Sequence, residues 1–165
     1  MTPHILHWLK RQVRPHVSLE SRVLEIGALN VNGSARDVLP VGNWLGIDRV
    51  PGRGVDLVTD AVEFMQSDTA LYDVVIACEC YEHDPRWWIT DALAKVKLSY
   101  GGLYVVTAPA IGFPFHDFGG DYYRFTEMAF TRVIFEGMNV LDLQTIPGDH
   151  PGENTVVGVA TNRVK

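Results

Sequence analysis

Three acidic residues stand at the carboxyl ends of the first three segments that have the apolar character of β-strands. They are Glu25, Asp48 and Asp60. In open α/β sheets, ligands bind in the crevice outside the carboxyl ends of the strands, so we expect the three carboxylates to face one ligand. Glu25 suits an ammonium group, Asp48 suits both hydroxyls of a ribose, and Asp60 suits the amine of an adenine. The set fits an amino acid, a ribose and an adenine, and requires no phosphate.

The sequence of the turn after the first strand distinguishes between two candidate classes of ligand. A dinucleotide site has the motif G-x-G-x-x-G at this place, which lets the backbone approach a pyrophosphate. Here Leu29 stands where the second glycine is needed, and Glu25 would repel a pyrophosphate. Asn32 and Gly33 supply a left-handed turn as readily as two glycines would. The turn therefore favours an amino-acid-bearing nucleoside over a dinucleotide such as NAD.

Two of these acids also have structural interpretations. Glu25 would serve the fold alone if it bonded only to backbone amides, but its place before the turn favours a ligand contact. Asp60 is an equally good N-cap for a helix that begins at Ala61. Both interpretations of Asp60 stay open.

A second polar cluster, Cys78 to Asp84, follows the most apolar strand, Tyr72–Cys78, and we expect it beside the same crevice. Within it, His83 has the ordinary pKa of a general base near neutral pH, although a single histidine is more often a structural hydrogen-bonding group. Cys78 and Cys80 lie two residues apart on one strand, which disfavours a disulfide and favours buried, reduced thiols.

A third cluster, residues 113–126, is a loop rich in aromatic residues after the fifth strand. It includes Phe118, and its polar members His116, Tyr122 and Arg124 are candidates for the wall of a substrate site. The alternative is an aromatic plug in which Arg124 pairs with Asp121. His83, His116, Asp117 and His150 show no ligand spacing such as H-x-x-x-H, so we expect no metal site.

Strands and helices alternate along most of the chain, which predicts an α/β fold with a doubly wound, mostly parallel sheet. The predicted strands are residues 22–26, 44–47, 55–58, 72–78, 103–107, 140–146 and 155–161, and the predicted helices lie within residues 1–15, 34–39, 61–65, 87–98 and 126–135. Trp88, Ala92, Leu93 and Val96 are expected on one face of the fourth helix, and Gly101–Gly102 as the turn after it. The eight residues between the last two strands are too few for a parallel crossover, so one of these strands runs antiparallel.

Composition limits the class of protein. The 165 residues predict one domain, with an N-terminal helix in residues 1–15 and a core over residues 22–165. A net charge of −6 supplies no basic patch for nucleic-acid phosphates. No apolar run approaches the roughly 20 residues that span a bilayer, and no secretory signal precedes the helix, so a cytoplasmic protein without a membrane partner is expected.

Several of these segments resemble the motifs of class I S-adenosylmethionine-dependent methyltransferases. They are Glu25-x-Gly27, Gly46-Ile47-Asp48, Thr59-Asp60-Ala61, Tyr72-Asp73-Val74-Val75 with Glu82-His83, and Gly101-Gly102-Leu103. The family's usual turn is E-x-G-x-G-x-G, whereas this chain has only Gly27 and Gly33. That form is similar to a variant in a small, type 11-like branch. The resemblance covers nearly the whole chain and implies a Rossmann-like sheet of seven strands, with the last strand antiparallel.

The resemblance implies transfer of a methyl group from S-adenosyl-L-methionine to an unidentified acceptor, with a small molecule favoured. The expected cofactor-binding residues are Glu25, Gly27, Ala28, Leu29, Asn32, Gly33, Asp48, Arg49, Asp60, Ala61, Cys78 and Glu79. Glu82, Tyr122 and Arg124 are expected to bind the substrate, and His83 and His116 are the candidate catalytic bases. The alternatives are a cofactor-binding module without turnover and a Rossmann-type NAD-dependent oxidoreductase. The oligomeric state stays open.

Overall fold

The computed structural model describes residues 1–117 and 119–162, so Phe118 and residues 163–165 lie outside the described residues. The strands are β1 (Arg22–Ile26), β2 (Asn43–Asp48), β3 (Leu57–Val58), β4 (Tyr72–Cys78), β5 (Leu98–Pro109), β6 (Asn139–Ile146) and β7 (Thr155–Thr161). The helices are α1 (Pro3–Gln12), α2 (Ala61–Ser67), α3 (Trp87–Val96) and α4 (Glu127–Ala129), which continues as a π-helical turn over Phe130–Ile134. Single 3-10 turns cover Arg14–His16, Ala35–Asp37 and Tyr81–His83.

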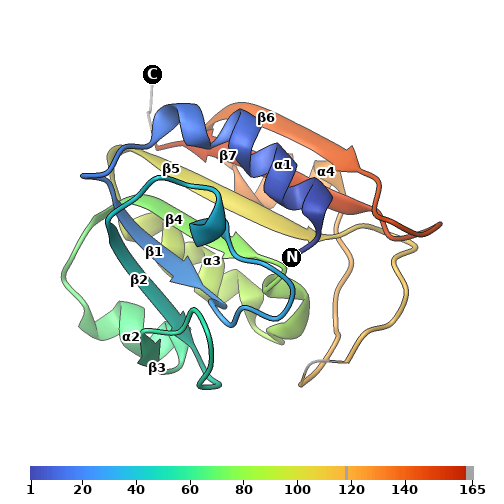
Figure 1. The fold of residues 1–165 in the computed structure, drawn as a ribbon, viewed down its shortest axis with the longest axis horizontal. Helices are drawn as coiled ribbons and strands as arrows, with labels where there is room; N and C mark the ends of the chain where they lie inside the picture. Colours follow the sequence, from blue (N-terminus) through green and yellow to red (C-terminus); the bar gives the residue numbers. More distant parts are fainter. Residues whose placement is uncertain (118, 163–165) are drawn as a thin grey trace.

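The seven strands form one sheet in the order β3-β2-β1-β4-β5-β7-β6 (Figure 1). β1 to β5 run parallel to one another, and β7 pairs antiparallel with both β5 and β6. The predicted fold class, a mostly parallel doubly wound sheet with an antiparallel last strand, is therefore confirmed. The order reverses between β1 and β4, and ligands of such sheets bind at this point, outside the carboxyl ends of the strands.

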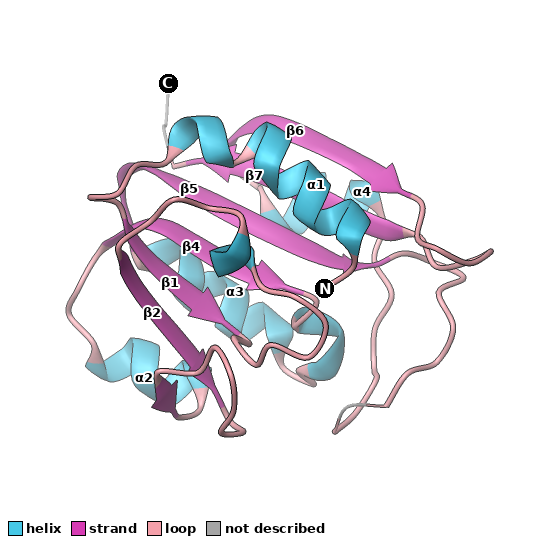
Figure 2. Ribbon diagram, in the orientation of Figure 1, coloured by secondary structure: helices cyan, strands magenta, loops and turns pink. Residues whose placement is uncertain are grey.

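Helices cover both faces of the sheet (Figures 1 and 2). α1 lies on one face, and α2, α3 and α4 lie on the other. Along β4, Val74 and Ile76 belong to the core beneath α1, whereas Val75 and Ala77 belong to the opposite core. This explains why β4 is a continuous apolar run, because a central parallel strand is buried on both sides. α1 is also tied to β6 by a hydrogen bond of 2.7 Å from Trp8 Nε1 to an oxygen of the Asp142 carboxylate.

The apolar face predicted for α3 is mostly exposed to solvent, although Leu93 packs against the core. Trp88 and Val96 are exposed by 51% and 68%, and Ala92 is exposed as well, whereas Thr90, Asp91 and Ala94 are buried. The buried face of α3 can include the acidic residue Asp91 because its carboxylate has hydrogen-bond and ion-pair partners. Asp91 accepts a hydrogen bond of 2.9 Å from the Tyr104 hydroxyl and pairs with Lys95 at 2.8 Å.

The predicted turn at Gly101–Gly102 is also wrong, because both glycines lie within β5. Tyr72 of β4 pairs with Leu98, but Val74 pairs with Leu103, so the intervening residues of β5 form a bulge. Gly101 has a φ of +77° in this bulge, a backbone conformation that favours glycine. Gly101 and Gly102, a pair that is typical of turns, therefore lie in this protein at a bulge within β5.

Three predicted elements are present but shorter than expected. The helix capped by Ser34 is one 3-10 turn, Ala35–Asp37, with reciprocal hydrogen bonds between Ser34 and Asp37. The third strand covers only Leu57–Val58, and the α-helical part after Thr126 covers only Glu127–Ala129 before the π-helical turn. β1 and β2 are therefore joined without a full helix, and Ala35, Val38 and Leu39 of this connection join α1 in covering its face of the sheet.

The longest helices, α1 and α3, have ten residues each. None of the helices in the described part of the chain is long and apolar enough to cross a membrane.

Candidate functional site

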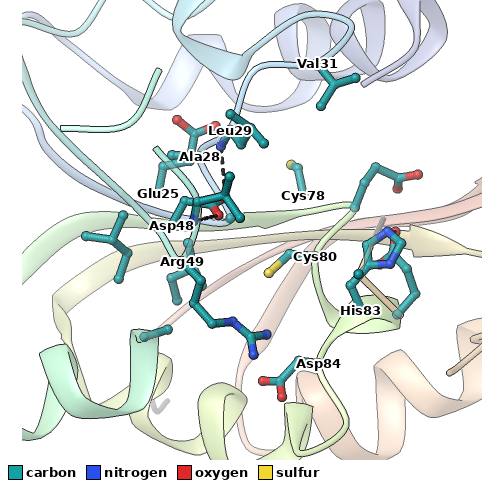
Figure 3. Close-up of a pocket in the computed structure, with 18 of the residues that line it drawn as sticks. Glu25, Ala28, Leu29, Val31, Asp48, Arg49, Cys78, Cys80, His83 and Asp84 are labelled. Atoms are coloured by element: carbon teal, nitrogen blue, oxygen red, sulfur yellow. Dashed lines mark hydrogen bonds and ion pairs between the residues drawn. The ribbon is translucent and has the colours of Figure 1, made fainter. Parts of the chain in front are cut away.

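A cavity of about 690 Å³ opens at the carboxyl ends of β1, β2 and β4, where the strand order reverses (Figure 3). Its volume is within the range of about 300–1,000 Å³ that is usual for small-molecule sites. All of the residues that the sequence predicts for cofactor binding line it. They are Glu25, Gly27, Ala28, Leu29, Asn32, Gly33, Asp48, Arg49, Asp60, Ala61, Cys78 and Glu79. Glu82, His83 and His116 line the same cavity.

The turn after β1 requires glycine at its first position. Gly27 has a φ of +74°, and a Cβ on it would lie 2.8 Å from Cys80 Sγ and 2.9 Å from Cys80 Cβ. The backbone amides of Gly27 and Ala28 both donate to the Ile47 carbonyl, at 3.0 and 3.1 Å. Gly33 has a φ of +125°, whereas Asn32 does not share the left-handed conformation. The turn is thus held between β2 and the segment that follows β4.

Glu25 is buried within the cavity wall, with 3% of its surface exposed. One carboxylate oxygen accepts a hydrogen bond of 2.9 Å from Trp44 Nε1 and lies 3.9 Å from Arg36 Nε. Burial raises the pKa of Glu25 to about 7, against the opposing effects of the Trp44 hydrogen bond and the Arg36 charge. Arg36 itself pairs with Asp56. A buried carboxylate with few donors favours a positively charged partner in the cavity.

Asp48 and Asp60 each hold backbone amides as well as facing the cavity. The two oxygens of Asp48 accept hydrogen bonds from Leu29 N at 3.1 Å and Val50 N at 2.9 Å. Asp60 is the N-cap of α2, so the structural interpretation of this residue is confirmed. Both of its capping bonds go to Oδ1. Because a carboxylate has about four acceptor sites, these bonds leave both residues able to accept hydrogen bonds from a ligand.

The opposite end of the cavity brings together residues far apart in the sequence. Glu82 and His83 lie on the 3-10 turn after β4, and His116 lies on the loop after β5. Glu82 Oε1 is 3.7 Å from His83 Nε2 and 3.9 Å from His116 Nε2. Burial raises the pKa of Glu82 well above its usual range, and the neighbouring Glu79 raises it further. Burial also lowers the pKa of His83, which keeps its imidazole neutral near pH 7.

Tyr122 and Arg124 are not among the residues that line the cavity. Arg124 pairs with Asp121 through two contacts, of 2.5 and 2.7 Å, and donates to the carbonyls of Phe113 and Pro114. The Arg124 hydrogen bond holds the pKa of Asp121 well below its usual range. This geometry favours the alternative in which Arg124 orders the loop. Asp121 also accepts from His116 N at 2.8 Å, so the pair helps to place His116.

Two features of the cavity were not predicted from the sequence: the approach of the N-terminal residues and the backbone conformation of Glu79. Met1 and Thr2, which immediately precede α1, line the cavity. Glu79 has a φ of +50°, the only positive value for a non-glycine residue in the described ranges. Its carboxylate accepts a hydrogen bond of 2.9 Å from the Thr107 hydroxyl, and burial raises its pKa. Strained backbone of this kind is concentrated at functional sites, but no sequence motif marks it.

The two thiols carry no nucleophilic chemistry at neutral pH. Cys78 and Cys80 are both free, as expected. Burial raises the pKa of each thiol well above its usual range. The reactive thiolate is therefore scarce near pH 7.

Comparisons with known proteins identify the fold. No family model matches the chain, and no curated protein matches it in sequence. Among solved structures, the N-methyltransferase NodS from Bradyrhizobium japonicum WM9, in complex with S-adenosyl-L-homocysteine, is similar with a TM-score of 0.75 at 16% identity, over 98% of this chain and 88% of that chain. The 1,6-didemethyltoxoflavin-N1-methyltransferase of Burkholderia thailandensis, with bound 1,6-didemethyltoxoflavin and S-adenosylhomocysteine, has a TM-score of 0.74 at 16% identity, over 94% of this chain and 77% of that chain.

A third similar structure is the magnesium protoporphyrin IX methyltransferase of Synechocystis PCC 6803 with bound S-adenosylmethionine. It has a TM-score of 0.62 at 10% identity, over 97% of this chain and 77% of that chain. At these identities the likeness establishes the fold. The chain has the fold of class I methyltransferases, as the motifs predicted.

Proposed function

We propose that the protein is an S-adenosyl-L-methionine-dependent methyltransferase. The observation that carries this proposal is the row of three acids, Glu25, Asp48 and Asp60, along one end of the cavity in a sheet of the methyltransferase type. Their order across the sheet follows the order of β1, β2 and β3. Similar structures contain S-adenosylmethionine or S-adenosylhomocysteine, which supports the same ligand here.

Each of the three acids would bind a different part of the cofactor. The Glu25 carboxylate, buried and short of donors, would bind the α-ammonium group of the cofactor. Asp48 would accept hydrogen bonds from the ribose hydroxyls, and Asp60 would accept one from the adenine amine through Oδ2. Leu29 and the cavity's other apolar side chains would exclude water from around the cofactor. The bound cofactor supplies an activated methyl group, so the protein contributes mainly position and the removal of a proton from the acceptor.

The acceptor end is then the part of the cavity at Glu82, His83 and His116. Burial lowers the pKa of His83, which favours the neutral imidazole that a general base needs. A cavity of about 690 Å³ gives room for a small acceptor beside the cofactor. We therefore infer a small-molecule acceptor that carries a protic nucleophile.

Isothermal titration calorimetry with S-adenosylhomocysteine tests this function. We expect the wild-type protein to bind one molecule, and Asp48→Asn to weaken binding about 10-fold or more, because a charged acceptor pair to the ribose is lost. Asp149→Asn is the control, since Asp149 is exposed in the β6–β7 turn and does not line the cavity. Absence of binding to the wild type, or equal binding by Asp48→Asn and the control, would contradict the proposal. Binding without methyl transfer to any of a broad set of acceptors would favour the binding-module alternative.

A further inference from the structure

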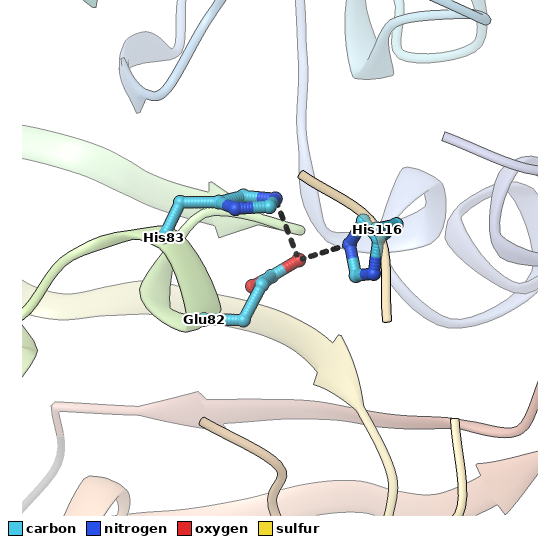
Figure 4. A group of neighbouring side chains, drawn as sticks. All are labelled: Glu82, His83 and His116. Atoms are coloured by element: carbon cyan, nitrogen blue, oxygen red, sulfur yellow. Dashed lines mark ion pairs between the residues drawn. The ribbon is translucent and has the colours of Figure 1, made fainter. Parts of the chain in front are cut away.

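Glu82, His83 and His116 form a compact group of donor atoms at the acceptor end of the cavity (Figure 4). Figure 4 shows the Glu82 carboxylate directed between the two imidazole rings. The ring centroids are 5.0 Å apart and the rings are nearly perpendicular. One oxygen or nitrogen from each residue lies within 4.8 Å of the others. All three side chains face the same small space.

The Glu82 carboxylate is short of partners. None of the residue is exposed to solvent, and neither carboxylate oxygen has a hydrogen-bond partner among residues 1–117 and 119–162. Burying an ionised carboxylate without donors or a counter-charge costs several kcal/mol in proteins. A cation held between Glu82 and the two imidazoles would offset this cost.

The imidazoles are oriented in the way that metal ligands are. His83 Nδ1 is hydrogen-bonded to the Gly120 carbonyl. His116 Nδ1 lies 3.3 Å from the Pro114 carbonyl oxygen and 3.5 Å from an oxygen of Asp121. A hydrogen on Nδ1 of each ring places the lone pair on Nε2, the atom that faces Glu82. Metal-binding histidines commonly donate their second ring N–H to a carbonyl or carboxylate in this manner.

The donor separations fit a small divalent ion. Zinc bonds of about 2.0–2.2 Å in tetrahedral geometry set neighbouring donor atoms about 3.3–3.6 Å apart. The two separations from Glu82 Oε1, 3.7 and 3.9 Å, are slightly longer than this, and all three donor atoms lie within 4.8 Å of one another, so the side chains would have to close around an ion. Imidazole and carboxylate donors together suit zinc and the neighbouring transition metals better than they suit calcium or magnesium.

We propose that Glu82, His83 and His116 bind one divalent transition-metal ion of the zinc class, with at least one coordination position open to the cavity. Three protein ligands and an open position are typical of catalytic rather than structural zinc sites. The sequence predicts no metal site, because these residues share no recognisable ligand spacing. As ligands, His83 and His116 would act through the ion instead of as general bases.

The open position gives the site a chemical role, which rests on the proposed methyl transfer. An acceptor hydroxyl bound to the ion would lose its proton to solvent more readily, because the metal lowers the pKa of the bound oxygen. The oxygen would then form a bond to the methyl carbon, while the bond from that carbon to sulfur breaks and its electron pair stays on sulfur. The metal site itself does not depend on this reaction.

The test uses the full-length, untagged protein, stripped of metal with a chelator and titrated with Zn²⁺ in the absence of any cofactor. We expect one ion to bind per chain, and His116→Ala and Glu82→Gln each to weaken binding at least about 10-fold. His150→Ala is the matched control, because His150 is exposed and does not line the cavity. Its affinity should equal that of the wild type. Substitution with Co²⁺ should give visible absorption bands of a low-coordinate ion in the wild type and lose them in His116→Ala.

His116→Ala keeps the test decisive if Glu82→Gln fails to fold, because His116 lies on a loop outside the sheet. Thermal unfolding in the presence of chelator checks that this variant is folded. The proposal is overturned if the wild type does not bind one Zn²⁺ ion, or if the ligand variants bind it as tightly as His150→Ala does. Calorimetry with S-adenosylhomocysteine is independent of this titration, so the metal site and the proposed function can fail separately.

Discussion

The two ends of the cavity differ in how their carboxylates are satisfied. At the β1–β3 end, Trp44 donates to Glu25, and backbone amides donate to Asp48 and Asp60. At the β4–β5 end, Glu82 has no hydrogen-bond donor within the described ranges. The protein supplies at least one donor to each carboxylate of the first end, although Glu25 still favours a positively charged partner, whereas Glu82 depends entirely on a proton or a positive charge from outside. We infer that the first end is shaped for its ligand before binding and that the second is completed by one.

Gly27 lies in the turn after β1 and packs against Cys80 in the segment after β4, so it is placed between the two ends of the cavity. Its substitution should have the largest effect on the free energy of unfolding. Gly27→Ala combines a left-handed φ of +74° with a contact of 2.8 Å to Cys80 Sγ. The conformational penalty is about 1–2 kcal/mol, and the steric conflict adds about 1–3 kcal/mol to the loss of unfolding free energy. Urea denaturation at pH 7 measures the loss, and affinity for S-adenosylhomocysteine should fall with it.

Gly137→Ala is the matched control for Gly27→Ala. Gly137 has a φ of +75°, but a Cβ there would meet nothing within 4 Å. Only the conformational penalty of about 1–2 kcal/mol is therefore expected. Equal losses in the two variants would show that the contact between the β1 turn and the segment after β4 is not tight.

The second largest effect concerns the pH dependence of stability at the β1–β3 end. The folded protein raises the pKa of Glu25 from 4.5 to about 7, so it holds the proton more tightly than the unfolded chain does. This contribution to stability is present below about pH 4.5 and is lost as the pH rises through about 7. The unfolding free energy of the wild type relative to Glu25→Gln should fall by about 2–3 kcal/mol between pH 5 and pH 8. Urea denaturation of both proteins at the two pH values measures this difference, and a constant difference would show that Glu25 ionises normally.

The smallest of the three effects is on ligand affinity. If the ammonium group of S-adenosylhomocysteine binds the ionised Glu25 carboxylate, its affinity should fall about 10-fold between pH 8 and pH 6. The sign follows from the raised pKa, because Glu25 is mostly ionised at pH 8 and mostly protonated at pH 6. Calorimetry at the two pH values provides the measurement. Glu25→Gln should bind weakly with little pH dependence, and a wild-type affinity that does not change would remove Glu25 from the ammonium site.

The sequence predicts the β1–β3 end well because its residues are local to strand ends. A short apolar run followed by Glu25, Asp48 or Asp60 places each carboxylate by the geometry of the sheet alone. β4 and β7 are predicted with the same boundaries that the structure has. The capping role of Asp60 is also visible in the sequence, since its position is that of an N-cap.

The β4–β5 end is predicted less well because tertiary contacts determine it. His83 and His116 are candidates by residue type, but only the path of the loop after β5 brings His116 near Glu82. That path depends on the Asp121–Arg124 pair and on carbonyls that accept from Arg124. The buried polar face of α3 was missed for a similar reason, because its hydrogen bond to Tyr104 joins residues of different elements.

A crystal structure with S-adenosylhomocysteine and Co²⁺, with diffraction data collected at the cobalt absorption edge, tests the account of the two ends most directly. We predict electron density for the ligand with its ammonium group at Glu25 and its ribose at Asp48. We also predict one anomalous peak at about 2.0–2.3 Å from Glu82, His83 and His116. Ligand density elsewhere, or no anomalous peak among these three residues, would contradict the account.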